Sequence, residues 1–531
     1  MAVQDVIAAG LEKGWRVTQG ASLTQDLTAE ADVVIIGTGA GGGTTAEILA
    51  QAGLRVILVE EGKLYHQKDF RMDELESYTR LYQEGMSRMT ADGAISILQG
   101  RCVGGSTTVN WTSSFRTPKP TLDYWTDALG VRDCREADMA PWFADREARL
   151  NIQPWGGEPN ENNSILKRGC ERLGWEWSLI PRNVVGCWNI GYCGMGCPTN
   201  AKQSTLVTTV PGALDAGAQL FHGLRAERLV HRQGRIEALE AVALDQDALH
   251  PTGIRVTLRA RHFVVSASAL GSPALLLRSG LPDPYGRVGK RTFLHPVNAT
   301  VAEMPQPVEP YYGAPQSIYS DEFVWKQGTT GRMGFKLEVP PLHPAMAVAV
   351  LPLHGNTLQT ELQRLPHLQA TLALLRDGFH AESTGGEVSL RSDGSPILDY
   401  PLNDYLWQGA REAYLRMAEV QFAAGASRVR LVHMDSPSFL RWPEAKQAIQ
   451  DIPMAPHRAR LFTAHQMGGC AMGEDPRTSV VDSYGVHHQV RNLSIHDASI
   501  FPTSIGANPQ LSVYAFSARN TQRLRAQLSA G

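Results

Sequence analysis

Hydrophobic residues near the start of the chain follow two kinds of pattern. A continuous β-branched run at residues 33–36 predicts a buried parallel strand, and residues 56–59 form a second such run. Between them, residues 44–50 have a helical composition and follow a glycine-rich turn. Strand, turn, helix and strand together predict one βαβ unit, with Glu60 at the end of its second strand.

Later segments mix both kinds of element. Residues 255–258 and 262–265 have the pattern of short strands, and a helix is expected to begin near Ser272. Beyond residue 300, proline-rich turns separate an expected strand at residues 346–351 from an expected helix at residues 407–424. This order of elements indicates a mixed α+β layer after the βαβ unit.

Composition narrows the class of protein. The chain has 531 residues, 43% of them hydrophobic and 19% charged, which is typical of a globular enzyme with more than one domain. A net charge of −3 argues against a nucleic-acid partner. The longest apolar stretch, residues 263–277, is shorter than the ~20 residues of a membrane span, so no transmembrane segment is expected. The absence of a leader pattern and the odd number of cysteines, seven, favour a cytoplasmic protein.

The glycine turn matches G-x-G-x-x-G at Gly37, Gly39 and Gly42. Its position between a strand and a helix, followed by Glu60 after seventeen further residues, predicts a dinucleotide site. Backbone N–H groups at the start of the helix would bind the pyrophosphate, and the Glu60 carboxylate would accept from ribose hydroxyls. The alternative is a turn that serves helix–strand packing only.

An acidic residue at this point favours NAD or FAD over a 2′-phosphorylated cofactor. The fingerprint does not choose between them, because the two cofactors share their ADP half. No second fingerprint follows in residues 61–531, and the glycines in residues 286–290 have the wrong spacing. A single dinucleotide site indicates that electrons come from an organic substrate.

Four later blocks carry a resemblance to a known family. They are residues 100–111, residues 267–280, residues 465–473 and residues 497–509. Together with the fingerprint, they resemble the glucose–methanol–choline (GMC) oxidoreductase family over about residues 30–520. The Asn110-Trp111 pair and the cysteine-containing segment up to residue 205 look most like the long-chain (fatty) alcohol oxidase branch and its bacterial relatives.

The resemblance implies an α/β fold in which a Rossmann-like FAD-binding domain is interleaved with an α+β substrate domain containing an antiparallel sheet. The FAD-binding domain would comprise residues 1–120, 200–300 and 455–531, and the substrate domain residues 121–199 and 301–454. The implied activity is FAD-dependent oxidation of an alcohol, by hydride transfer to flavin N5. An apolar primary alcohol, aliphatic or aromatic, is the preferred substrate, with dioxygen, a quinone or a cytochrome as electron acceptor.

The resemblance also implies roles for individual residues. His465 would accept the hydroxyl proton, since histidine can act as a neutral base near working pH. Asn508 cannot act as a base, but its amide can donate to the substrate oxygen and orient it. By the same resemblance, further cofactor contacts are expected from Gly104, Gly105, Ser106, Asn110, Asp497, Ala498 and Pro509.

Several alternatives stay open at this point. Leu294 stands where the family commonly has Asp or Asn before a histidine, so the role of His295 is not assigned. Trp111 and Phe115 would either roof the substrate pocket or belong to the core. A lyase or photodecarboxylase-like activity and a non-catalytic flavin-binding protein are the rival functions. The following three cysteines are interpreted as reduced thiols, with no metal site expected, although their spacing can hold a metal or an iron–sulfur cluster: Cys187, Cys193 and Cys197.

Overall fold

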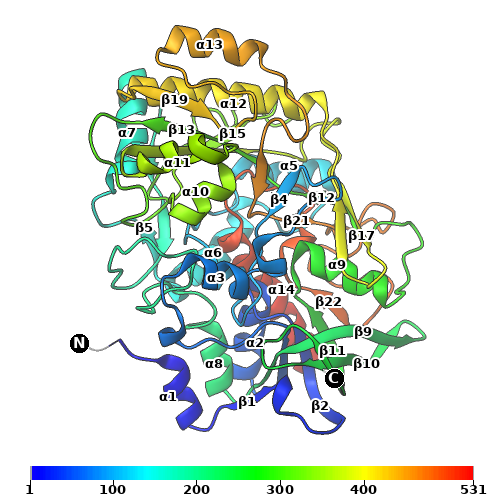
Figure 1. Cartoon of the computed structure of the whole chain (residues 1–531). Coiled ribbons are helices and arrows are strands. Elements are labelled where there is room, and N and C mark those ends of the chain that lie inside the picture. Colours follow the sequence, from blue (N-terminus) through cyan, green and yellow to red (C-terminus); the bar gives the residue numbers. More distant parts are fainter. Residues whose placement is uncertain (1–2, 530–531) are drawn as a thin grey trace.

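The computed structural model describes residues 3–529 and contains two eight-stranded sheets (Figure 1). The first sheet carries the predicted βαβ unit. In this sheet, the pairs β1–β8, β8–β3, β3–β2, β2–β11 and β11–β22 are parallel. The pairs β11–β10 and β10–β9 are antiparallel. Its order is β1 (Arg16–Gln19), β8 (Gln219–His222), β3 (Val56–Glu60), β2 (Leu27–Ile36), β11 (Pro251–Val265), β10 (Arg235–Leu244) and β9 (Leu224–Arg232), with β22 (Leu493–Ile495) on β11.

The second sheet is antiparallel apart from the β4–β20 pair. Its order is β4 (Ile95–Ile97), β20 (Leu461–Thr463), β13 (Val297–Glu303), β16 (Leu368–Leu375), β15 (Phe335–Glu338), β14 (Ile318–Ser320) and β6 (Ser178–Leu179), with β19 (Arg428–Leu431) on β13. Smaller sheets join β18 (Pro396–Asp399), β17 (Gly386–Leu390), β12 (Lys290–Phe293) and β21 (Met467–Gly468), and β5 (Ile152–Pro154) with β7 (Pro181–Asn183). The predicted fold class is confirmed, while the domain boundaries stay a prediction.

The helices lie around and between the two sheets. They are α1 (Val6–Glu12), α2 (Ala40–Gln51), α3 (Glu74–Leu81), α4 (Ser106–Val109), α5 (Lys119–Leu129), α6 (Glu136–Arg149), α7 (Glu161–Leu173), α8 (Thr209–Asp215), α9 (Ser268–Arg278), α10 (Pro344–Val350), α11 (Gly355–Gln363), α12 (Asp404–Ala423), α13 (Trp442–Asp451) and α14 (Gln510–Ser529). Within residues 3–529, no helix has the length and apolar character that crossing a bilayer requires.

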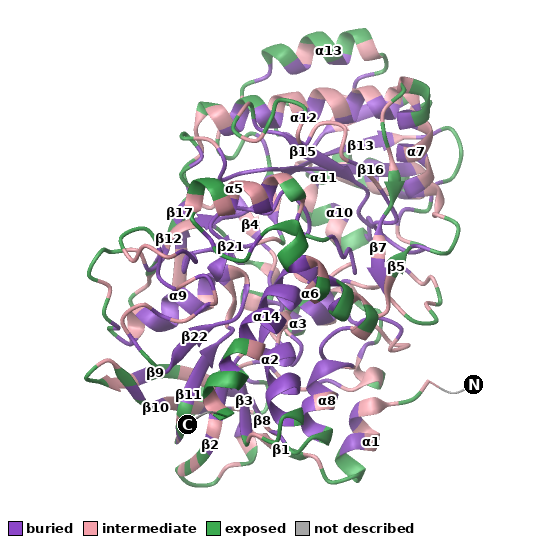
Figure 2. Cartoon of the chain, turned by 180° about the vertical axis from the view of Figure 1, so that it is seen from behind, coloured by how far each residue is buried: buried purple, intermediate pink, exposed green. Residues whose placement is uncertain are grey.

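Alternating side chains explain why the first sheet is buried on both faces. Val33 and Ile35 pack in the same core cluster as Leu49 of α2, whereas Val34 and Ile36 pack in the cluster that contains Leu275 of α9. The second sheet is covered by α12 on one face and by α10 and α11 on the other. Figure 2 shows the resulting buried interior. Helix α14 is buried over much of its length, whereas α13 is a largely exposed helix at one end of the molecule.

The structure corrects the expected strand at residues 346–351, which is the helix α10 followed by Leu351. The run reads as a strand because a short apolar segment gives no clear period, yet Pro344 in its first turn favours a helix start. The two short strands expected within residues 255–265 are one strand, β11. Helix α9 begins at Ser268, earlier than expected, and contains Pro273 in its interior.

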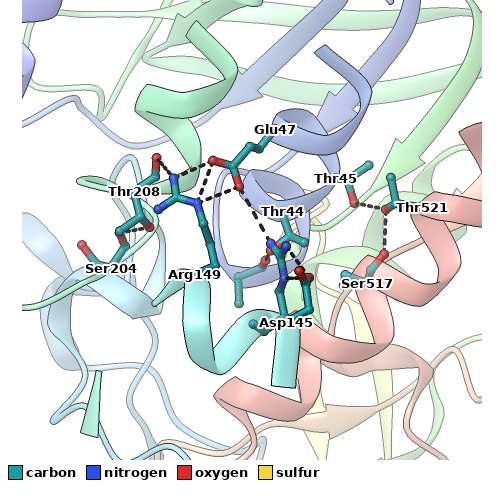
Figure 3. A network of polar contacts seen from close by, with 11 residues as sticks. Thr44, Thr45, Glu47, Asp145, Arg149, Ser204, Thr208, Ser517 and Thr521 are labelled. Carbon is teal, nitrogen blue, oxygen red and sulfur yellow. Dashed lines mark hydrogen bonds and ion pairs between the residues drawn. The ribbon is translucent and has the colours of Figure 1, made fainter. Parts of the chain in front are cut away.

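Helix α2, which follows the glycine turn, is held from two sides (Figure 3). The buried carboxylate of Glu47 accepts from Arg149 Nε of α6 at 3.0 Å, and Arg149 also donates to the Thr208 carbonyl at 2.9 Å. On the other side, the hydroxyls of Thr45 and Thr521 lie 3.0 Å apart, and Thr521 belongs to α14. These contacts fix the helix whose N-terminus faces the candidate site.

Candidate active site

The turn between β2 and α2 is shaped by its glycines. Gly37 has φ of 103°, and a Cβ there would collide with the Ser266 carbonyl. A Cβ on Gly42 would likewise collide with the Gly37 carbonyl. Gly39, the N-cap of α2, has no heavy atom within 4 Å of its Cβ position outside the turn itself. The N-terminus of α2 therefore faces open space of the kind that a pyrophosphate occupies.

Glu60 ties the fingerprint to the second sequence block. Its Oε2 accepts from the Thr38 backbone at 3.2 Å and from the Thr38 hydroxyl at 2.6 Å, and its Oε1 accepts from Gly62 N at 2.9 Å. The Thr38 hydroxyl oxygen also accepts from Gly104 N at 2.9 Å. Burial raises the pKa of Glu60. The carboxylate thus stands at the junction of two segments, at the edge of the cavity described below.

The second block lies directly against the glycine turn. A Cβ on Gly105 would be 3.1 Å from Gly39 Cα, so the two backbones approach closely. Asn110 follows α4, and its Nδ2 donates to Gln510 Oε1 at 2.7 Å. This contact joins the second block to the first residue of α14 and fixes the Asn110 side chain at the cavity wall.

The Asp497 carboxylate accepts hydrogen bonds from backbone N–H groups of the chain. Its Oδ2 accepts from Ser268 N at 2.9 Å and its Oδ1 from Ser499 N at 2.8 Å, so it caps the short helix η5 (Ala498–Ile500) and ties it to α9. Burial raises the pKa of Asp497. Ala498 is thereby held at the cavity wall, next to Asp497 itself.

A cavity of about 1220 Å³ joins these segments. Its volume exceeds the usual 300–1000 Å³ of a small-molecule site, as expected for a dinucleotide together with a substrate. Two of the expected site residues, Gly42 in the first turn of α2 and Gly104 just before α4, are not part of its lining. The expected residues that line it are Gly37, Gly39, Glu60, Gly105, Ser106, Asn110, His465, Asp497, Ala498, Asn508 and Pro509.

His465 lies two residues after β20 and points its ring at a second histidine. His465 Nδ1 and His295 Nδ1 are 3.1 Å apart, and the two ring planes are inclined by 29° with centroids 5.2 Å apart. The backbone N–H of His465 donates to the Thr463 hydroxyl at 3.0 Å. Burial lowers the pKa of His465 to about 4. The imidazole is therefore neutral at neutral pH, the state that a proton acceptor requires.

His295 is held by a carboxylate that the sequence analysis missed. The backbone N–H groups of Leu294 and His295 donate to the two oxygens of Asp377 at 3.0 and 3.1 Å. Tyr400 donates its hydroxyl to Asp377 at 2.7 Å. Asp377 thus brings a carboxylate to the segment where Leu294 replaces the usual acidic or amide residue. No local pattern marks Asp377, because it is 83 residues from Leu294 in the sequence.

Asn508 donates through Nδ2 to Glu338 Oε2 at 3.1 Å. Glu338 was not among the expected site residues, although a carboxylate in the wholly buried strand β15 is an unusual feature. Gln316, which also donates to Glu338 at 2.6 Å, was missed as well and lines the cavity.

The wall of the cavity near the second sheet is apolar. It is formed by Trp111, Val297, Leu372, Leu374 and Phe462. Phe115 does not line the cavity; it packs edge-on against Tyr319 with centroids 4.8 Å apart.

The three clustered cysteines are free thiols and are partly exposed. Cys193 Sγ lies 3.7 Å from an Arg182 nitrogen, and Cys187 Sγ accepts from Asn189 N at 3.4 Å. Within the described part of the chain, no three His, Cys, Asp or Glu residues are grouped as metal ligands.

Sequence comparison finds matches to known family models. Residues 78–297 match the N-terminal model and residues 381–517 the C-terminal model of GMC oxidoreductase. An uncharacterized GMC-type oxidoreductase of Mycobacterium tuberculosis is 31% identical over 489 residues, covering 91% of this chain and 74% of the relative. Long-chain-alcohol oxidase FAO4A of Arabidopsis thaliana is 28% identical over 531 residues, covering 94% and 69%.

Comparison with solved structures gives the same architecture. Formate oxidase of Aspergillus oryzae superposes with a TM-score of 0.70 at 16% identity, covering 95% of this chain and 99% of that chain. Pyridoxine 4-oxidase of Mesorbium loti superposes with a TM-score of 0.67 at 19% identity, covering 93% and 98%. At these identities the likeness concerns the fold alone.

Proposed function

The chain belongs to the GMC oxidoreductase family, and from this premise we propose that it uses FAD to oxidise an apolar primary alcohol, aliphatic or aromatic, to the carbonyl. One observation carries the proposal: the dinucleotide turn at Gly39, the neutral histidine His465 and the amide of Asn508 all line the same cavity. A hydride acceptor and a proton acceptor are what alcohol oxidation requires, and the cavity can hold both.

The residues of the site fit FAD. A carboxylate has about four acceptor positions. Three donors of the chain occupy three of these positions on Glu60, so one position is left for a ribose hydroxyl. The open space at Gly39 suits the pyrophosphate, and Gly105, Ser106, Asn110, Ala498 and Pro509 lie along the same cavity. When bound, FAD supplies the acceptor for the hydride that leaves the alcohol carbon.

His465 is the proposed base. Because its Nδ1 and that of His295 share one hydrogen bond, one of the two must carry the hydrogen. With the hydrogen on His465 Nδ1, His465 Nε2 is free to accept the hydroxyl proton, and His295 acts as the acceptor that fixes this tautomer. The amide of Asn508 orients the substrate oxygen.

The apolar wall supports the substrate class. Trp111, Leu372 and Phe462 offer no charged partner for a polar substrate, and they leave room for an alkyl chain or an aromatic ring. The similarity to long-chain-alcohol oxidases supports the same choice. The electron acceptor that completes turnover is dioxygen, a quinone or a cytochrome, and comparing reoxidation by each would identify it.

An anaerobic titration tests the proposal. Purified protein is mixed with a panel of alcohols of increasing chain length and with aromatic alcohols, and the flavin absorbance is followed. We expect bleaching by apolar primary alcohols. A flavin that binds normally but is not reduced by any alcohol would contradict the proposal and favour a lyase, a photodecarboxylase-like enzyme or a non-catalytic flavin-binding protein.

A further inference from the structure

Glu338 is a fully buried carboxylate at the edge of the active-site region. It ends β15, where it is paired with Leu372 of β16, and Lys336 is paired with Leu374. Cross-strand partners point to the same face of a sheet, and both leucines line the cavity. Glu338 therefore lies on the cavity face of the second sheet without belonging to the cavity lining itself.

Two cavity-lining amides converge on one oxygen of this carboxylate. Glu338 Oε2 accepts from Asn508 Nδ2 at 3.1 Å and from Gln316 Nε2 at 2.6 Å. Gln316 is fixed in turn, because its Oε1 accepts from the Ser113 hydroxyl at 2.7 Å. Within residues 3–529, Glu338 Oε1 and Asn508 Oδ1 have no hydrogen-bond partner. The chain of contacts Ser113–Gln316–Glu338–Asn508 runs along the cavity and ends at the proposed orienting amide.

The charge of Glu338 decides which end of the Asn508 amide faces it. An ionised carboxylate can only accept hydrogen bonds, so it requires the NH₂ group on its side. A protonated carboxyl can donate as well, and it would then accept the flipped amide, with the carbonyl of Asn508 facing it. The observed contact, with the NH₂ group facing Glu338 Oε2, is the one that the ionised form requires.

We propose that Glu338 is the positioning residue of Asn508: its ionised carboxylate fixes the orientation of the amide that Asn508 presents to the substrate oxygen. The proposal rests on the proposed function only for the role of Asn508 toward the alcohol. The Glu338–Asn508 contact itself does not depend on it.

Burial of Glu338 and the charged groups around it set the pH at which this orientation is lost. Burial raises the pKa of Glu338 to about 7, Lys336 on the same strand lowers it, and Asp321 raises it. Lys336 itself lies within ion-pairing distance of Asp321 and above the Tyr319 ring. The carboxylate is ionised above neutral pH, so amide positioning is expected to weaken as the pH falls through about 7.

The test compares Glu338→Gln, Asn508→Ala and the double variant. Anaerobic flavin reduction by the best alcohol is expected to slow about 5- to 10-fold in Glu338→Gln above neutral pH, since a charge-assisted hydrogen bond becomes a neutral one. In the Asn508→Ala background the same change is expected to have an effect of less than about twofold, because the residue it acts through is gone. Glu361→Gln, which removes another buried carboxylate charge beside Arg428, is the matched control and should keep the parental rate.

A second readout needs no substrate. The infrared carbonyl band of a protonated carboxylic acid is recorded across about pH 5 to 9 in the FAD-loaded protein. We expect a band that titrates near neutral pH in the parent, is absent in Glu338→Gln, and titrates at higher pH in Asn508→Ala, where a donor to the carboxylate is missing. These infrared results would stand even if no alcohol reduces the flavin, so failure of the proposed function is distinguishable.

Two outcomes would overturn the proposal. One is a double variant whose rate of flavin reduction falls by the product of the two single losses, from Glu338→Gln and from Asn508→Ala. This result would show that the two residues act independently. The other is an infrared titration that does not change in Asn508→Ala. FAD content and thermal unfolding are measured for each variant, so that a misfolded protein is not counted as a positioning effect.

Discussion

His465 and His295, 170 residues apart in the sequence, lie with their Nδ1 atoms 3.1 Å apart. Burial lowers the pKa of both rings, and the neighbouring His465 lowers the pKa of His295 further. A neutral pair with one shared hydrogen is therefore the stable state at neutral pH. The pair couples the segment after β20 to the segment between β12 and β13 at the proposed site of proton transfer.

This pair predicts the pH dependence of flavin reduction. The base must be neutral, and protonation of His465 blocks it, so the rate is expected to fall with decreasing pH as the pH approaches about 4. The step attributed to Glu338 should appear separately, near pH 7. Stopped-flow reduction under anaerobic conditions, from below pH 4 upwards, measures both steps. A step near 6.5, the ordinary value for histidine, that persists in Glu338→Gln would contradict the buried environment of His465.

Glu60 predicts a change in cofactor retention. Glu60→Gln removes the negative charge of the carboxylate that accepts hydrogen bonds from Thr38, Gly62 and a ribose hydroxyl. The Kd for FAD is therefore expected to rise about 10-fold. Equilibrium binding of FAD to the apoprotein measures this. Glu240→Gln, a strand carboxylate of the same sheet paired with Arg228, is the control and should bind FAD as the parent does. Parental affinity in Glu60→Gln would show that the ribose is held elsewhere.

The three clustered cysteines are predicted to take no part in electron transfer. Cys193 contacts Arg182, and Cys187 accepts a backbone hydrogen bond. Cys193→Ser is therefore expected to retain FAD and to turn over at the parental rate. Iron and sulfide analysis provides the check: a stoichiometric cluster in the parent, lost together with electron transfer in the variant, would show a dehydrogenase that passes electrons through this segment.

Buried histidines also predict the pH dependence of stability. Burial lowers the pKa of His262 to about 3, and its Nε2 lies 2.7 Å from the Ser494 hydroxyl. The unfolded chain binds a proton below about 6.5 that the folded chain rejects, so the free energy of unfolding falls as the pH decreases. Between pH 6.5 and about 5, we expect the parent to lose about 2 kcal/mol relative to His262→Gln. Urea unfolding at both pH values measures the difference, and equal losses would contradict it.

The βαβ unit and its glycine turn could be predicted from the sequence because their signals are local. The glycine turn, α2 and Glu60 lie within residues 37–60, so one stretch of sequence contains both the geometry and the chemistry. The identity of β2 and β3 follows from continuous β-branched runs that are buried on both faces. The family blocks located His465 and Asn508, and both line the cavity.

The carboxylates that hold the proposed catalytic residues and their neighbours in place could not be predicted in the same way. Glu338 reaches Asn508 across 170 residues, and Asp377 reaches Leu294 across 83. Such contacts depend on how β15 and β16 pair with their neighbours, which no local period encodes. The expected strand at residues 346–351 was wrong for a related reason: an apolar run of this length is compatible with either structure until its burial is known.

The most direct test of the account is the rate of anaerobic flavin reduction in His465→Ala. We expect FAD to stay bound and the rate with the best alcohol to fall by ~10²–10⁴-fold, the range for loss of a positioned general base. His433→Asn, a buried histidine bonded to the Pro453 carbonyl outside the cavity, is the control and should reduce its flavin normally. Reduction of the His465→Ala flavin at the parental rate would contradict the assignment of His465 as the base.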